Sequence, residues 1–195
     1  MRKINKLLAI CTATALLVGL LAACGSKSFV YKSTDKQGVF QNNFFTITYD
    51  EELLTLTETA PKEGETTALI SLAGKEHLPR LDILNVSLSG LTTETPDEEF
   101  YNLVLPVIKA YYASDLRDKI TFGIPTVLVS EQDGQLDCTV SVTADEYKAA
   151  LLPKTVFDVE IKGKEQGVIT LFIHGELDDT TRKPYTDALA SLELK

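Results

Sequence analysis

The sequence has 195 residues, with 28 Asp and Glu against 19 Lys and Arg, and a formal net charge of −9. An acidic chain repels phosphate backbones, which argues against nucleic acid as a partner. The length suits one domain with a hydrophobic core of its own.

The first 23 residues have the layout of a processing segment. Arg2, Lys3 and Lys6 precede an uncharged, mostly apolar run over Leu7–Ala23. A basic region, an apolar region and then small residues are typical of a secretory signal peptide. The alternative is an uncleaved membrane anchor, but a spanning helix needs about 20 apolar residues and this run is slightly shorter.

The end of the apolar run resembles the lipobox of bacterial lipoproteins. Its four residues are Leu-Ala-Ala-Cys, at Leu21–Cys24. The resemblance implies that a diacylglyceryl group is attached to the Cys24 sulfur and that cleavage occurs between Ala23 and Cys24. Two acyl chains give stable attachment, whereas one chain anchors only marginally. The mature protein is therefore expected on the extracytoplasmic face of a bacterial membrane, held by its lipid.

Processing changes the composition of the chain. The mature residues 24–195 contain 16 basic and 28 acidic residues, a net charge of −12. Cys138 is then the only free thiol, and its alternating sequence context predicts a small buried hydrophobe rather than a nucleophile. Residues 24–39 are expected to form the lipidated N-terminus and a tether, and residues 40–195 a single domain.

The first part of this domain has the alternation of apolar and polar residues that is typical of strands. Four strands are expected, over Phe44–Asp50, Leu53–Thr59, Thr66–Gly74 and Arg80–Gly90. In the last of them, the alternate set that contains Leu84, Val86 and Leu88 is expected to face the core, although Asp82 belongs to the same set.

A helix with a clear start signal follows. Thr95 as the N-cap, Pro96 as the first helical residue and Glu98 three residues after the cap predict a capping box. Apolar residues at helical spacing over positions 100–111 predict one buried face. Pro106 lies within this stretch and predicts a kink or a break.

The second half of the domain is again rich in strands. Asp133–Gly134 predicts a tight hairpin turn, and a second hairpin is expected around 162–167. Between the hairpins, Thr143–Leu152 can be read as a short capped helix or as a continued strand, and we favour the helix. A C-terminal helix is expected from about Thr181, because Tyr185 and the apolar residues after it share one helical face.

Two pairs of neighbouring aromatic residues are expected to straddle the core boundary. One pair, Phe44 and Phe45, opens a strand, and the other, Tyr111 and Tyr112, ends the central helix. In each pair one ring is predicted to enter the core and the other to lie near the surface.

The order of these elements predicts an α+β fold, an antiparallel sheet with a central capped helix and a C-terminal helix packed on it. The order resembles that of the PsbP-like fold over about Phe40 to Leu194, with the local phrases FTITYD, GIPTVLVSEQDG and ASLEL. The resemblance implies an α/β/α sandwich and a role in binding or assembly. It supplies no functional residues to transfer.

The sequence has no Gly-x-Ser-x-Gly and no His-Glu-x-x-His. His174, Glu176 and Asp178 or Asp179 follow a predicted strand, and with His77 they form a candidate divalent-metal site. The competing interpretation, which we favour, is a polar loop that caps the last helix.

These observations define two functional hypotheses. The first is a membrane-anchored extracytoplasmic lipoprotein that acts as a non-enzymatic binding or accessory module at the cell envelope, with an envelope protein as partner and no cofactor. The alternative is a metal-dependent envelope hydrolase that uses the His174, Glu176 and Asp178 cluster.

Overall fold

The computed structural model describes residues 30–62, 65–75, 78–112, 120–144 and 155–195. At its centre is a seven-stranded antiparallel sheet in the order β4-β5-β6-β10-β9-β8-β7. Its strands are β4 (Thr55–Thr59), β5 (Leu69–Ala73), β6 (Arg80–Ser87), β7 (Thr126–Gln132), β8 (Gln135–Ala144), β9 (Thr155–Gly163) and β10 (Gln166–His174).

A second sheet has four antiparallel strands in the order β1-β2-β3-β11. They are β1 (Ser33–Lys36), β2 (Val39–Asn42), β3 (Phe45–Thr48) and β11 (Glu193–Leu194). The helices are α2 (Asp97–Ala110) and α3 (Asp179–Ala190). The predicted mixed α+β class is thus confirmed. Within the described ranges no helix is long and apolar enough to cross a membrane.

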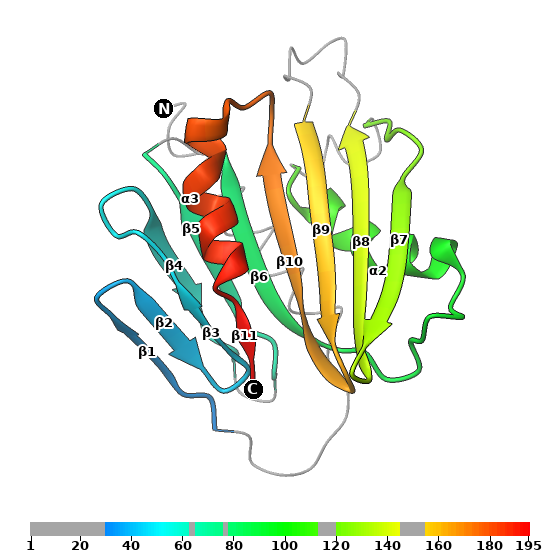
Figure 1. Cartoon of the computed structure of the whole chain (residues 1–195), viewed down its shortest axis with the longest axis horizontal. Coiled ribbons are helices and arrows are strands. Elements are labelled where there is room, and N and C mark those ends of the chain that lie inside the picture. Colours follow the sequence, from blue (N-terminus) through cyan, green and yellow to red (C-terminus); the bar gives the residue numbers. More distant parts are fainter. Residues whose placement is uncertain (1–29, 63–64, 76–77, 113–119, 145–154) are drawn as a thin grey trace.

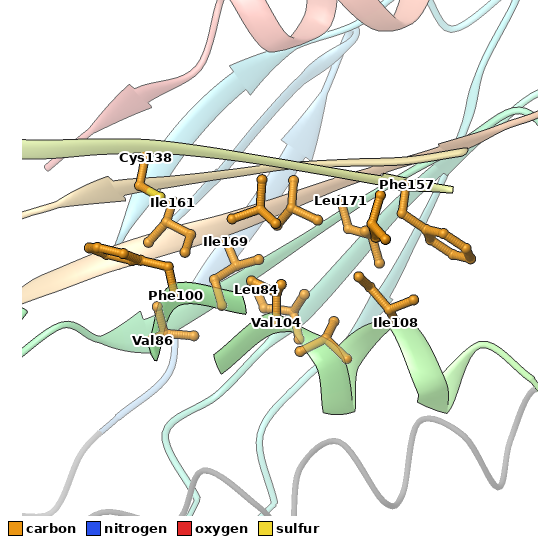
Figure 2. Packing of buried hydrophobic residues seen from close by; sticks show 14 of the residues in the cluster. Leu84, Val86, Phe100, Val104, Ile108, Cys138, Phe157, Ile161, Ile169 and Leu171 are labelled. Atoms are coloured by element: carbon orange, nitrogen blue, oxygen red, sulfur yellow. The ribbon is translucent and has the colours of Figure 1, made fainter. Parts of the chain in front are cut away.

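The elements form layers on both faces of the large sheet. Figure 1 shows α3 and the small sheet on the near side and α2 on the far side. On the α2 side, Phe100, Val104 and Ile108 pack against strand residues that include Leu84 and Ile169, as Figure 2 shows. A separate apolar cluster lies on the near side and contains residues of β2, β3, β5, β6, β10 and α3.

Strand β6 is buried on both faces, which differs from the prediction. Leu84 and Val86 belong to the cluster under α2, while Leu81 and Ile83 belong to the cluster under the small sheet. The alternation therefore separates two cores rather than a core from solvent. Asp82 is also buried, and its Oδ1 accepts a hydrogen bond from Nε of Arg80 at 2.6 Å.

The start of α2 corrects the predicted capping box. Pro96 occupies the N-cap position and the helix begins at Asp97, with no side-chain cap. The Thr95 hydroxyl instead accepts from the backbone N–H of Thr92 at 2.9 Å, so it closes a turn before the helix. The helix contains Pro106 and continues to Ala110, so the predicted break does not occur.

Both hairpins of the second half are confirmed. Asp133 and Gly134 have φ values of 55° and 70°, and positive φ at both central positions is the mark of a type I′ turn. Strands β9 and β10 pair directly, with Gly163 opposite Gly167. A Cβ at Gly163 would lie 2.4 Å from the Cα of Gly167, so this close approach requires glycine.

Three other boundaries differ from the expected ones. Strand β1 lies within the expected tether, so the folded domain starts before position 40. Thr143 pairs with Val156 and belongs to β8, so no helix begins there; residues 145–152 lie outside the described ranges. The predicted C-terminal helix is confirmed as α3 and begins two residues before Thr181.

Candidate functional site

Half of the large sheet has an uncovered face. In Figure 1, α3 and the small sheet lie over the β4–β6 side, and no described element lies in front of β7, β8 and β9. Because Cys138, Val140 and Phe157 face α2, the alternate residues of these strands point the other way. We call this surface the open face; its residues include Thr126, Leu128, Ser130, Asp137, Thr139, Ser141, Asp158, Glu160 and Lys162.

The open face is mainly polar, and its apolar residues are Leu128 of β7 and the partly buried Val156 of β9. Thr139 lies at its centre, paired with Leu128 of β7 and with Glu160 of β9. Leu128 is 66% exposed. Lys162 contacts Glu160 at 3.0 Å and Asp137 at 3.7 Å, so the only lysine of the face is already paired and the net charge of the face is negative.

A polar network joins the open face to α3. We call it the His174 cluster; it consists of Ser141, Asp158, His174 and Arg182. The Ser141 hydroxyl donates to Asp158 Oδ1 at 2.6 Å, and Asp158 Oδ2 lies 3.0 Å from His174 Nε2. Arg182 brings Nη2 to 3.4 Å from the same ring nitrogen and places its guanidinium carbon 5.6 Å from the centre of the Phe172 ring. The cluster thus joins β8, β9, β10 and α3 through the half-buried Asp158 carboxylate and the His174 ring.

The electrostatics of the cluster centre on Asp158. The hydrogen bond with His174 is the main reason that the pKa of Asp158 lies below its usual value, and the Ser141 hydrogen bond and the positive charge of Arg182 act in the same direction. On the other side of the ring, His174 Nδ1 lies 2.6 Å from the carbonyl oxygen of Gly175. Each ring nitrogen therefore has an oxygen within hydrogen-bond distance, and Nε2 also faces the Arg182 guanidinium, which can only donate.

The order of groups in the cluster differs from that of a catalytic triad. In a triad the histidine lies between the serine and the carboxylate, so that it can take the serine proton. Here Asp158 lies between Ser141 and His174. The ring is also buried, with 4% of the residue exposed. The arrangement therefore connects strands rather than activating a nucleophile.

The described residues of the metal site proposed from sequence do not form a metal-binding group. Asp178 is the N-cap of α3, where its side chain accepts from the N–H of Thr181 at 2.8 Å, and this bond lowers the pKa of Asp178. Glu176 is exposed. Among the described residues no group of three or more His, Cys, Asp or Glu could hold a metal ion, and His77 lies outside them. The alternative, a loop that caps the last helix, is confirmed for Asp178.

The Cys138 thiol and the two aromatic pairs lie where the sequence predicts. Cys138 is fully buried, with its side chain in the α2-side core in Figure 2, and burial raises the pKa of its thiol to about 12. Phe45 and Tyr112 are buried, while their neighbours Phe44 and Tyr111 are only partly buried, as predicted. Ala23 and Cys24 lie outside the described residues.

Sequence reasoning missed three members of the His174 cluster. Ser141 and Asp158 occupy ordinary outward positions in alternating strands, and Arg182 follows an expected helix start. Their relationship depends on the pairing of β8 with β9 and of β9 with β10. No local sequence signal marks this relationship.

Comparison with known proteins identifies no family for this chain. No family model matches it, and no curated protein matches it.

Proposed function

We propose that this chain is a lipoprotein, anchored through Cys24 on the extracytoplasmic face of a bacterial membrane, and that it acts as a non-enzymatic binding or accessory module of the cell envelope. The lipobox-like residues Leu21–Cys24 support the anchor. The layering of α2, sheet and α3 supports a PsbP-like α/β/α sandwich, a fold whose resemblance implies a binding or assembly role.

The observation on which the binding role rests is the open face. An antiparallel sheet usually packs one face on the core, and the other face is exposed to solvent where its side chains are polar. Here β10 is covered on both faces, whereas its neighbours β9, β8 and β7 have one uncovered face. The exposed Leu128 offers a protein partner an apolar contact, and the Thr, Ser and acidic side chains around it would form the polar rim of such an interface.

The test is partner capture by crosslinking in the native envelope. Thr139→Arg places a long charged side chain at the centre of the open face, and Thr57→Arg makes the same change at an exposed position of β4. We expect Thr139→Arg to reduce recovery of the crosslinked partner at least about tenfold and Thr57→Arg to leave it unchanged. Thermal unfolding should first show that both variants are folded. Equal recovery of the crosslinked partner from the two variants would then mean that the binding surface lies elsewhere.

A further inference from the structure

We propose that the outer edge of β7 binds an extended segment of the partner protein, which adds a strand to the large sheet. This inference deepens the proposed binding function and rests on it. Among the described strands, β7 is the last of the sheet and pairs only with β8. An unpaired edge presents a row of backbone N–H and C=O groups, which is the template for strand addition.

The turn fixes which backbone groups are available. In a two-residue type I′ hairpin the residues that flank the turn form a hydrogen-bonded pair, here Gln132 and Gln135. Bonded and non-bonded positions then alternate along the strand. The N–H and C=O groups of Val127, Val129 and Glu131 therefore point away from β8. Among the described residues, no backbone hydrogen bond outside the sheet uses them.

The edge has few of the features that usually protect an exposed strand. Its pairing with β8 is regular over Thr126–Gln132, without a bulge; Glu131 is the only charged residue of the strand, and the nearest proline, Pro125, lies just before it. The opposite edge of the same sheet is different. There β4 is shorter, and its Glu58 accepts hydrogen bonds from the side chains of Tyr31 and Ser33, which lie in the N-terminal segment.

The side chains of β7 define the chemistry of the added strand. Val127 and Val129 are partly buried against the α2-side core, and Glu131 follows on the same face. Residues that pair directly across two strands share a face. The partner segment should therefore have two apolar residues and one Lys or Arg at alternate positions, with the basic residue opposite Glu131.

The charge of the protein favours such a partner over a second copy of the chain. Two mature copies each have a net charge of −12, so their association brings like charges together. Antiparallel pairing of two β7 strands about Val129 would also place Glu131 of each copy opposite Val127 of the other. A basic-apolar segment avoids both conflicts.

The experiment uses the mature lipidated protein in detergent and a fluorescent peptide, Thr-Lys-Thr-Val-Thr-Val-Thr, followed by anisotropy. Val129→Pro removes an outward N–H without removing a bond to β8, so the fold should be kept. We expect Val129→Pro to weaken binding at least about tenfold. Glu131→Lys should shift the preference to the peptide with Glu in place of Lys, and Glu52→Lys, the same change on a distant exposed turn, should have no effect.

Each other outcome contradicts the inference. If the peptide does not bind, or binds equally to the wild type and all variants, the β7 edge is not the binding site. If Val129→Pro does not fold, the peptide preference of Glu131→Lys tests the inference by itself. Concentration-dependent dimerisation that Val129→Pro abolishes would show that the occupant is a second copy. If partner capture is lost in Thr139→Arg but unaffected by Val129→Pro and Glu131→Lys, the binding function stands and the edge inference fails.

Discussion

Asp158 of β9 and His174 of β10 are diagonal neighbours across two antiparallel strands, with 3.0 Å between Oδ2 and Nε2. Asp158 pairs directly with Phe172. His174, two residues after Phe172, pairs with Val156, two residues before Asp158. His174 is the last residue of β10, so their contact lies at the end of the sheet that is next to the start of α3. Arg182 of α3 contacts His174 there. The pair therefore couples the open face to the helix that covers the other half of the sheet.

The first prediction concerns the pH dependence of stability through Asp158. Its pKa in the folded state lies below the unfolded value of about 3.9. The contact therefore contributes stability above that pH, and the contribution is lost as the pH falls through the folded-state pKa. Because 35% of the side chain is exposed, we expect about 0.5–1 kcal/mol.

The measurement is urea unfolding of wild type and Asp158→Asn between pH 3 and pH 7. The variant should be less stable at pH 7, and the difference should shrink below pH 4. Asp133→Asn is the matched control, since it makes the same chemical change in a turn where asparagine is equally suited. A constant difference between wild type and Asp158→Asn over this pH range would contradict the role of the charge.

A second prediction concerns the pair formed by the partly buried Arg80 and the buried Asp82. Nε of Arg80 donates to Asp82 Oδ1 at 2.6 Å, and Nη2 donates to Ser71 Oγ at 3.0 Å. Removing one member leaves the other charge buried without its partner. We expect Arg80→Met to lower the free energy of unfolding by about 3 kcal/mol, and Arg80→Met combined with Asp82→Leu to restore most of it. Chemical denaturation of the two variants checks this, and an additive loss in the double variant would refute it.

A third prediction concerns the packing of α2 on the sheet. Phe100 is fully buried between the helix and the strands in Figure 2. Phe100→Ala should lower the free energy of unfolding by about 3–5 kcal/mol, because the lost ring leaves a cavity that the sheet cannot fill. Asn102→Ala, at an exposed position of the same helix, should change it by less than about 0.5 kcal/mol. Similar losses in the two variants would mean that the helix does not pack as described.

The fourth prediction concerns the anchor. Cys24→Ser removes the sulfur that the lipobox resemblance requires, so the chain should accumulate as the uncleaved precursor. Mass spectrometry of the wild type should show cleavage before residue 24 and the mass of an attached lipid. Cys138→Ser provides a control, because that thiol is buried in the core and distant in sequence from the anchor. An unmodified thiol at position 24 in the wild-type protein would exclude lipid anchoring.

Features set by neighbouring residues could be predicted from the sequence. The hairpin at Asp133–Gly134 needs only two residues that tolerate positive φ. The C-terminal helix needs a cap and an apolar face, and Asp178 and Tyr185 supply them. The burial of one ring in each aromatic pair follows from the alternation or periodicity of its own element.

Features set by distant residues could not be predicted. The alternation of β6 has the pattern of a half-exposed strand, and only the small sheet and α3 bury its second face, through residues such as Leu81 and Ile83. The Thr95 hydroxyl could accept a hydrogen bond either as the helix N-cap or within the preceding turn. In the structure it accepts from Thr92, in the turn. The sequence offered His174 as a candidate metal ligand beside the favoured capping-loop interpretation. Its contact with Asp158 could not be predicted, because Asp158 lies 16 residues earlier on another strand.

Strand β11 has a kinetic consequence for how this molecule folds. It pairs with β3, and the Ser191 hydroxyl bonds to the backbone of Thr48, a contact that spans 143 residues. Bringing together segments so far apart costs about 4 kcal/mol of chain entropy before other contacts offset it. We therefore expect the layer of β1, β2 and β3 to dock late and slowly, with Phe40 and Phe45 exposed to chaperones or proteases until it does.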